Sequence, residues 1–374
     1  DLRGPRLPSG AQHQMEDIQL NLLGSRGDSL ETLPEIDREL QREVDKLFPN
    51  RHASYSLAVL DITPGRPIRY AERYANRAFA SGSIGKIGIA AGMFEQLAKI
   101  YPDDVDKRRE LLKTHKVVAD KWIIADSHDV PIFNPQTKEY ELRPIEEGDV
   151  FSLYEWLDHM LSASSNAAAS TVWKEAMLMR YFGKDYPPTY EEELQFYSDN
   201  SRDNLGIVAQ PIVNTPFWSV GIERGDWHLG SFFTWMGKQR VPSGGRSVAS
   251  PKGLMQLMVA LERGQIVDEW SSRELKMLLY MTFKRIRYAS APRLWPARVY
   301  FKSGSLYSCY EEPGFDCGKY MGNALNVMNS VAIVEHPDGT TYMVSLMSNV
   351  LRKNSAVEHQ SLATFIDRII RIIL

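Results

Sequence analysis

The feature that most constrains the fold is a change of hydrophobic period along the chain. Residues 54–63 alternate between the two faces of a strand and end at Pro64-Gly65, which predicts a strand followed by a turn. Residues 298–302 predict another strand, and residues 329–335 and 340–347 predict a hairpin around an Asp-Gly turn. The middle of the chain is mostly helical in pattern. The simplest packing is therefore one sheet built from both ends of the chain.

Helical periodicity fills most of the remaining sequence. Residues 185–246 are an exception, because they are rich in Pro, Gly, Asn and Asp, which favours loops with short helices. We expect an α/β (α+β) fold with an antiparallel sheet flanked by helices, plus an all-helical lobe. The expected helices cover residues 30–48, 84–100, 151–168 (interrupted near its serines), 253–263, 271–281 and 356–373.

The same pattern predicts the domain organisation. We expect a flexible N-terminal tail over residues 1–28 and one catalytic domain over residues 29–374. Within that domain, residues 29–82 and 296–374 would form the sheet lobe, and residues 83–295 the helical lobe. A crevice between two lobes is a usual place for a ligand site.

Composition excludes several classes of protein. The chain is 43% hydrophobic and 24% charged, as in ordinary globular proteins, and its net charge of −3 does not favour nucleic acid or an anionic membrane. No apolar run reaches the roughly 18 residues that a spanning helix needs. The histidines lack metal-ligand spacing, so we expect no metal, no other cofactor and no nucleic-acid partner.

Ser83-Ile84-Gly85-Lys86 places a serine three residues before a lysine. On a helix, residues three apart share a face, so the amine can lie beside the hydroxyl. A neutral, partly desolvated lysine can take the proton of a serine and make it a nucleophile. The alternative is a helix cap followed by a surface lysine, because about one or two such pairs arise by chance in a chain of this length. The motif alone is weak evidence.

Lys302-Ser303-Gly304 ends a predicted strand and is rarer by chance, with about 0.2 occurrences expected per chain. It would offer a cation, a hydroxyl and backbone donors to an anionic acyl substrate. Gly304 would remove a side chain that blocks the approach of a ligand to the backbone. The alternative is a strand that simply runs into a turn.

Ser-x-Asn occurs twice, which forces a choice. Ser164-Ser165-Asn166 lies between an apolar helical stretch and three alanines, whereas Ser198-Asp199-Asn200 follows a run of glutamates in a loop-like segment. A catalytic pair needs rigid support, which only the first site has. We therefore choose Ser164 and Asn166 and interpret the second occurrence as a solvated turn.

Taken together, the three motifs resemble those of class A serine β-lactamases and penicillin-binding proteins, the penicillin-recognising serine hydrolases. Residues 160–170 look like the class A helix that carries the second motif, and residues 250–281 resemble the helix pair before the last strands. The hairpin and the closing helix are also similar to the class A chain end. The resemblance covers about residues 30–374.

The resemblance implies a role for each motif residue. Ser83 would attack the carbonyl carbon and Lys86 would accept its proton. Ser164 would pass a proton to the leaving nitrogen, and Asn166 would bind the substrate amide and Lys86. Lys302 would supply positive potential and support Ser164. The substrate carboxylate would bind Ser303, and the backbone N–H groups of Ser83 and Ser305 would form the oxyanion hole.

The chain departs from the class A pattern in one respect. Class A β-lactamases carry Glu-x-x-x-Asn between the second and third motifs, and the glutamate holds the deacylating water. No asparagine here has that glutamate, and the matching stretch, residues 225–243, is apolar. Glu223 and Asp226 are the nearest acids, but the motif does not carry over to either. We therefore expect acylation with weak deacylation.

The substrate and location follow only from the resemblance. It implies a β-lactam or a D-Ala-D-Ala-like, peptidoglycan-derived peptide as substrate. The alternatives are a peptidoglycan D,D-peptidase and a non-hydrolytic penicillin sensor. Residues 1–10 do not read as a signal peptide, so we expect either a cytoplasmic protein or one whose signal has been removed. The resemblance implies a periplasmic or secreted protein whose leader has been removed.

The two cysteines leave two possibilities open. Cys309 and Cys317 are close enough in sequence to close a small disulfide loop, but two free thiols fit the spacing equally well. Export of the protein, which the resemblance implies, would favour the bridge.

Overall fold

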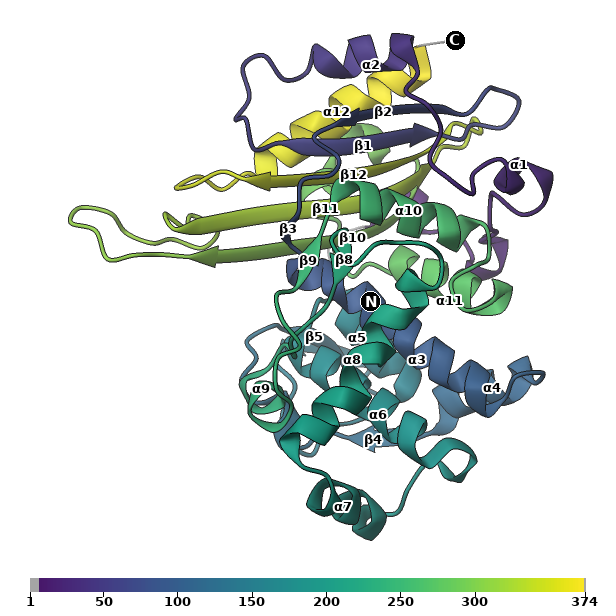
Figure 1. The fold of residues 1–374 in the computed structure, drawn as a ribbon, viewed down its shortest axis with the longest axis vertical. Coiled ribbons are helices and arrows are strands. Elements are labelled where there is room, and N and C mark those ends of the chain that lie inside the picture. Colours follow the sequence, from purple (N-terminus) through teal and green to yellow (C-terminus); the bar gives the residue numbers. More distant parts are fainter. Residues whose placement is uncertain (1–6, 373–374) are drawn as a thin grey trace.

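The computed structural model describes residues 7–372 of the chain. Its largest sheet has five strands in the order β10-β11-β12-β1-β2, all antiparallel. β1 (Ser56–Asp61) and β2 (Arg69–Arg73) come from the start of the chain. β10 (Arg298–Ser308), β11 (Leu325–Glu335) and β12 (Thr341–Asn349) come from its end, as Figure 1 shows. The mixed fold with a sheet built from both chain ends is confirmed.

Helices cover both faces of this sheet (Figure 1). One face packs against α2 (Arg38–Asp45) and α12 (Ala356–Ile372), whose buried side chains share a core with β1 and β12. The other face packs against α10 (Pro251–Glu262) and α11 (Glu269–Tyr280). Because the sheet is covered on both sides, β11 and β12 are buried along almost their whole length. α10 and α11 therefore lie against the sheet, although the sequence assigned residues 83–295 to the helical lobe.

The helical lobe is centred on α3 (Lys86–Ile100), α5 (Leu153–Leu161) and α6 (Asn166–Phe182). α3 has small and apolar residues all around, and it is buried because it packs against α6 and α8 (Arg202–Trp218). Smaller elements complete the lobe. They are α4 (Val105–Thr114), α9 (Trp235–Arg240) and the short strands β4 (Lys116–Val118), β5 (Val130–Asn134), β6 (Glu139–Arg143) and β7 (Val150–Ser152).

A three-stranded sheet lies where the two lobes meet. It has the order β3-β9-β8, from β3 (Phe79–Ala80), β9 (Val248–Ala249) and β8 (Trp227–His228). β3 leads directly into the segment that carries Ser83. This small sheet therefore fixes the approach of the chain to the predicted nucleophile.

Residues 185–246 contain more helix than the sequence predicted. α7 (Tyr190–Asp199) and α8 are ten and seventeen residues long, although α8 contains Pro211 and Pro216. Two side-chain caps start these helices: Thr189 accepts a hydrogen bond from Glu192 N, and Ser201 from Asn204 N. Burial of one α8 face against α3 outweighs the prolines, so the prediction of loops with short helices was wrong here.

The segment before the sheet also differs from the prediction. Residues 7–28 are not a loose tail, because Ile18 and Leu22 are fully buried and Asn21 N donates to Glu262 of α10 at 2.6 Å. Lys276 of α11 pairs with the same Glu262 at 2.7 Å and donates to Gln19 O. Residues 1–6 of the predicted tail lie outside the described part of the chain. α2 is shorter than the helix expected over residues 30–48.

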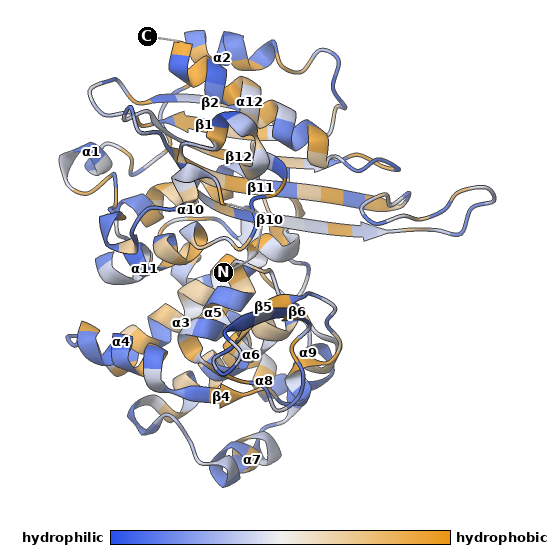
Figure 2. Ribbon diagram, turned by 180° about the vertical axis from the view of Figure 1, so that it is seen from behind, coloured by the Kyte–Doolittle hydropathy of each residue, from blue (hydrophilic) through white to orange (hydrophobic). Residues whose placement is uncertain are grey.

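The connection between β10 and β11 is a long hairpin that projects beyond the sheet (Figures 1 and 2). β10 continues to Ser308, six residues past the strand that the sequence predicted. The structure joins Cys309 and Cys317 by a disulfide bond inside this hairpin. Among the described helices, none is long and apolar enough to cross a membrane.

Candidate active site

Ser83 lies in a short 3-10 helix (Gly82–Gly85) that runs directly into α3, and Lys86 is the first residue of α3. The helical spacing brings Lys86 Nζ to 3.2 Å from Ser83 Oγ. Lys86 is fully buried, whereas Ser83 is only partly buried. A buried amine beside an accessible hydroxyl has the geometry of a base and its nucleophile.

The second motif occupies the turn between α5 and α6. Ser164 has a φ of 63°, a left-handed conformation that non-glycine residues rarely adopt and that is concentrated at functional sites. Asn166 starts α6, and its Oδ1 accepts a hydrogen bond from Lys86 Nζ at 2.8 Å. Lys86 Nζ also donates to the Ser164 carbonyl oxygen and lies 3.4 Å from Ser164 Oγ. The chosen Ser-x-Asn therefore contacts the buried lysine.

The third motif completes this cluster from the sheet side. Lys302 Nζ, on β10, donates to Ser164 Oγ at 2.8 Å. Ser164 Oγ thus lies between the amines of Lys86 and Lys302. The structure brings together side chains from three distant segments of sequence, and a continuous set of contacts leads from Ser83 to Lys302.

Two glycines allow the 3-10 helix to lie directly against β10. Gly82 has a φ of 53°, and a Cβ there would lie 2.8 Å from Ser305 N. A Cβ on Gly304 would lie 2.6 Å from Ser81 O and 3.0 Å from Ser83 N. The missing side chain of Gly304 therefore makes room for the chain around Ser83, whereas the sequence assigned that room to a ligand.

Burial changes the acid–base properties of both lysines. Burial lowers the pKa of Lys86 to about 7, and the nearby carboxylate of Asp126 limits the decrease. Burial also lowers the pKa of Lys302 well below its usual range, and the positive charges of Lys86 and Arg287 act in the same direction. Lys86 can therefore be neutral near pH 7, the state in which an amine accepts a proton.

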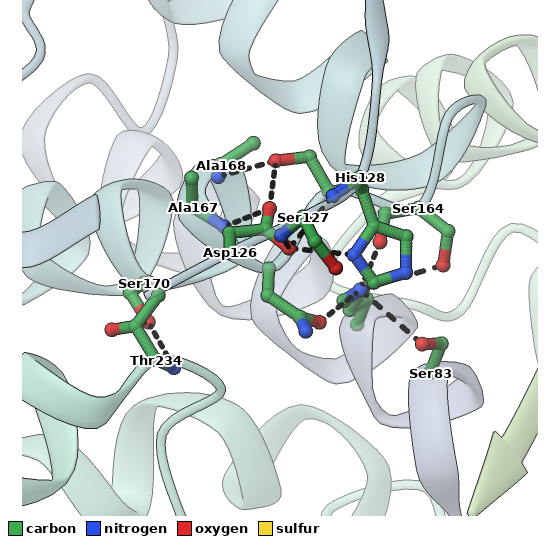
Figure 3. Close-up of polar contacts among 12 residues, drawn as sticks. Ser83, Asp126, Ser127, His128, Ser164, Ala167, Ala168, Ser170 and Thr234 are labelled. Atoms are coloured by element: carbon green, nitrogen blue, oxygen red, sulfur yellow. Dashed lines mark hydrogen bonds and ion pairs between the residues drawn. The ribbon is translucent and has the colours of Figure 1, made fainter. Parts of the chain in front are cut away.

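Asp126 is a site residue that the sequence analysis missed. Figure 3 shows its carboxylate between the start of α6 and the ring of His128. Asp126 Oδ2 accepts from Ala167 N at 2.8 Å and from Ser165 Oγ at 2.9 Å, and Oδ1 lies 2.6 Å from His128 Nδ1. Although burial opposes it, these hydrogen bonds hold the pKa of Asp126 well below its usual range. One carboxylate thus fixes the second motif from a separate loop.

Arg287 is the second missed residue. Its guanidinium donates to Gly304 O at 2.8 Å and to Ser305 Oγ at 3.1 Å, so it braces the third motif from behind. Burial lowers the pKa of Arg287, but an arginine stays charged at neutral pH. Neither residue belongs to a motif, because Asp126 is in a polar loop and Arg287 in a basic segment, and no spacing pattern points to either.

A cavity of about 210 Å³ opens beside the Ser164–Lys302 contact. Its wall includes Ser303, Thr282, Lys284 and the acid Asp129. The arrangement offers hydroxyls and cations, with one carboxylate among its lining residues. Ser303, at which the substrate carboxylate is expected, is part of this wall.

The opposite wall, next to Lys86, is apolar. Lys86 Nζ lies 4.9 Å from the centre of the Phe233 ring, and Leu229 packs against Gly85 just below it. Neither of the two acids that the sequence analysis considered for this wall is paired with Lys86. Asp226 accepts from Ser250 Oγ at the start of α10, and Glu223 is exposed. In the described part of the chain, Lys86 has no ion pair with a carboxylate.

The rejected Ser-x-Asn lies away from this cluster. Ser198 and Asp199 are exposed at the end of α7, and Asn200 Nδ2 caps that helix by donating to Phe196 O at 2.8 Å. These residues have a local structural role and no contact with Lys86. They are a helix end rather than the predicted free turn.

Comparison with known proteins agrees with this geometry. The family model described as the β-lactamase enzyme family matches residues 39–374. No curated protein matches the chain in sequence. Among solved structures, a β-lactamase from Sphaerobacter thermophilus is 17% identical with a TM-score of 0.54, over 89% of this chain and 96% of that one. A β-lactamase from Chitinophaga pinensis is 15% identical with a TM-score of 0.56, over 89% and 97%.

Penicillin-binding protein neighbours are as similar as the β-lactamases. PBP-A is 15% identical with a TM-score of 0.55, over 91% of this chain and 97% of that one. At these identities the likeness of structures establishes the fold alone, whereas the family model covers nearly the whole chain. The chain therefore belongs to the β-lactamase enzyme family and is a β-lactamase-like serine hydrolase.

Proposed function

We propose that Ser83 forms an acyl-enzyme with β-lactams or with D-Ala-D-Ala-like peptides, and that this acyl-enzyme is hydrolysed slowly. The observation that carries the proposal is the continuous set of contacts from Ser83 through Lys86 and Ser164 to Lys302. A PBP-A variant, 16% identical to this chain, is described as an acyl-enzyme complex with penicillin G.

Acylation uses the two amines on either side of Ser164. Neutral Lys86 takes the proton of Ser83 Oγ across 3.2 Å as the oxygen attacks the carbonyl carbon. The backbone N–H groups of Ser83 and Ser305 stabilise the oxyanion, a contribution of roughly 3–4 kcal/mol per donor in other enzymes. The proton then passes through Ser164 Oγ to the leaving nitrogen, while Asn166 holds Lys86 in place.

The substrate carboxylate binds in the cavity beside Lys302 and Ser303. Burial and the nearby amine of Lys86 and guanidinium of Arg287 lower the pKa of Lys302. A bound carboxylate supplies the opposite charge, which raises the pKa of Lys302 and favours its charged form.

Deacylation lacks equivalent support. An acyl-serine is cleared by a water that needs a base within hydrogen-bond reach. Lys86 Nζ lies 4.9 Å from the centre of the Phe233 ring and Leu229 lies beside Gly85, while Asp226 accepts from Ser250 Oγ and Glu223 is exposed. An apolar ring excludes water rather than orienting it, which favours a long-lived acyl-enzyme.

The proposal includes a periplasmic or secreted location, which the Cys309–Cys317 bridge supports because disulfides persist in oxidising compartments. A fluorescent penicillin resolved on a denaturing gel tests the chemistry. A persistent labelled band is the expected result. Rapid hydrolysis of a chromogenic cephalosporin without a band would show an efficient β-lactamase instead. Release of D-alanine from a D-Ala-D-Ala peptide would favour the D,D-peptidase alternative, and no reaction with any acyl donor would overturn the proposal.

A further inference from the structure

One residue in the wall of the cavity beside Lys302 has no part in the proposed function. Asp129, in the loop before β5, lines the same cavity as Ser303, at which the substrate carboxylate is expected. Two carboxylates in one cavity repel each other, so an acid here weakens the binding of a simple anion. A ligand that brings a positive charge as well as a negative one would remove this conflict.

The cavity presents two opposite charges that do not pair with each other. Asp129 comes from the helical lobe, and Lys284 comes from the segment after α11. Both side chains are exposed, and within residues 7–372 neither has a hydrogen bond or an ion pair. Asp126, three positions before Asp129, is different, because Figure 3 shows its carboxylate fully engaged. Unpaired charges of both signs in one cavity complement a zwitterionic ligand.

The rest of the cavity is larger and more apolar than a carboxylate needs. At about 210 Å³ it has room for roughly seven water-sized groups, of which a carboxylate fills about three. Four apolar side chains line the remaining space: Leu161, Phe283, Ile286 and Phe301. Apolar walls suit the methylene stem of a long side chain whose charged end lies at a polar position. The cavity therefore fits an amino acid with such a side chain.

The loop that carries Asp129 is anchored on both sides. Before it, Asp126 accepts a hydrogen bond from the start of α6 at 2.8 Å. After it, Val130 is fully buried at the start of β5 and pairs with Arg143 of β6. The guanidinium of Arg143 forms a two-point ion pair with Asp149, at 2.8 and 2.9 Å. The position of the Asp129 carboxylate is therefore preorganised, which lowers the entropic cost of binding.

We propose that Asp129 binds the ammonium group of a cationic side chain on the amino acid that leaves during acylation. The inference rests on the proposed function of Ser83. The Ser83 Oγ–carbon bond forms, the C–N bond breaks, and the proton that passes through Ser164 Oγ goes to the leaving nitrogen. The released residue keeps its carboxylate at Ser303 and its side chain against the apolar wall. The preferred donors thus end in a D-amino acid of the lysine or ornithine type.

The experiment measures how well two acetylated dipeptides protect Ser83 from fluorescent penicillin. Acetyl-D-alanyl-D-lysine carries the ammonium group, whereas acetyl-D-alanyl-D-norleucine has the same stem without it. In the natural enzyme the lysine donor should give half-protection at a roughly three- to tenfold lower concentration, the gain expected from a charge-assisted hydrogen bond at a partly exposed site. The gain should shrink at about 1 M salt, because salt screens exposed charges.

Three variants show whether Asp129 carries the preference. Asp129→Asn keeps the shape without the charge, so the ratio between the two donors should fall to about one. Asp129→Lys reverses the charge and should make a donor that ends in D-glutamate protect better than the lysine donor. Asp106→Asn is the control, because it removes an exposed acid on α4 outside the cavity and should keep the natural ratio. A ratio of donors is unaffected by a general change in the labelling rate.

Equal protection by the two donors in the natural enzyme would overturn the inference and leave the proposed function intact. The same conclusion follows if neither donor protects although penicillin labels Ser83. A preference for lysine that survives in Asp129→Asn would also overturn the inference, because another group would then bind the ammonium. If penicillin does not label Ser83 at all, the proposed function fails, and the inference fails with it.

Discussion

The two sides of Lys86 differ in polarity. On one side, Ser83, Ser164 and Asn166 place polar atoms within 3.4 Å of its amine. On the other side, Phe233 presents a ring face and Leu229 fills the space beneath it. In the proposed mechanism the polar wall forms the acyl-enzyme, whereas the apolar wall has no group that activates water. The contrast predicts a site that is complete for the first half of a reaction and incomplete for the second.

The strongest test of the polar wall is removal of the nucleophile. Ser83→Ala should abolish covalent labelling by fluorescent penicillin, because in the proposed mechanism Ser83 Oγ is the nucleophile that forms the acyl bond. Thermal unfolding should show the fold intact, since Ser83 is only partly buried. Undiminished labelling of the variant would mean that the nucleophile lies elsewhere.

The next test separates the two Ser-x-Asn sites. Asn166→Ala removes the acceptor for Lys86 at 2.8 Å and should slow acylation by about 10²–10³-fold, as loss of a well-placed polar group does in other active sites. Asn200→Ala is the matched control, because Asn200 only caps α7. It should change the rate less than about twofold, given the small effect of an exposed helix end. If Asn200→Ala slowed acylation more than Asn166→Ala, the second motif would have been assigned to the wrong site.

The apolar wall can be tested by changing it. With a chromogenic cephalosporin, the natural enzyme should release one equivalent in a burst and then turn over slowly. Phe233→Glu places a carboxylate beside Lys86 and should speed the slow phase at least about tenfold, because a positioned general base contributes 10²–10⁴-fold. Phe233→Gln has nearly the same shape without the base and should not. A fast linear rate in the natural enzyme would contradict the contrast, and Glu223→Gln and Asp226→Asn would then identify the acid.

The smallest expected effect is a shift in pH dependence. Acylation needs neutral Lys86, so its rate should rise with pH through about 7, the pKa of this lysine. The Asp126 carboxylate raises that pKa, so Asp126→Asn should move the rise to lower pH, by up to about one unit. Asp106→Asn removes an exposed acid on α4 that does not line the cavity and should leave the profile unchanged. A shift to higher pH in Asp126→Asn would show that Asp126 acts only through the position of the second motif.

The sequence was most informative where chemistry and periodicity coincide. Alternation over residues 54–63 and the Asp-Gly turn signal of the closing hairpin predicted strands at both chain ends, although the sheet is buried on both faces. Residue spacing predicted that Ser83 and Lys86 lie together, because that contact is local to one helix. The choice of Asn166 over Asn200 came from the apolar context that a rigid helix needs. The catalytic roles of these residues remain predictions.

The sequence was least informative where long-range packing decides. The caps at Thr189 and Ser201 and the burial of α8 overrule Pro211 and Pro216, which local propensity alone counted against a helix. Asp126 contacts Ala167, 41 positions later, and Arg287 contacts Gly304, 17 positions later, in both cases in a different element. No spacing rule indicates such partners, so only the folded structure could identify them.

The topology has a consequence for the order in which the enzyme becomes competent. Ser164 contacts Lys302, which lies 138 positions later in the chain. The hydroxyl of Thr63 donates to the carbonyl oxygen of Thr341 on β12, which lies 278 positions later. During synthesis the helical lobe is therefore complete long before the sheet that carries the third motif. Contacts so distant in sequence close late in folding. A nascent chain that holds Ser83 and Lys86 but not β10 lacks Lys302 and Ser303, so under the proposed mechanism it cannot yet form the acyl-enzyme.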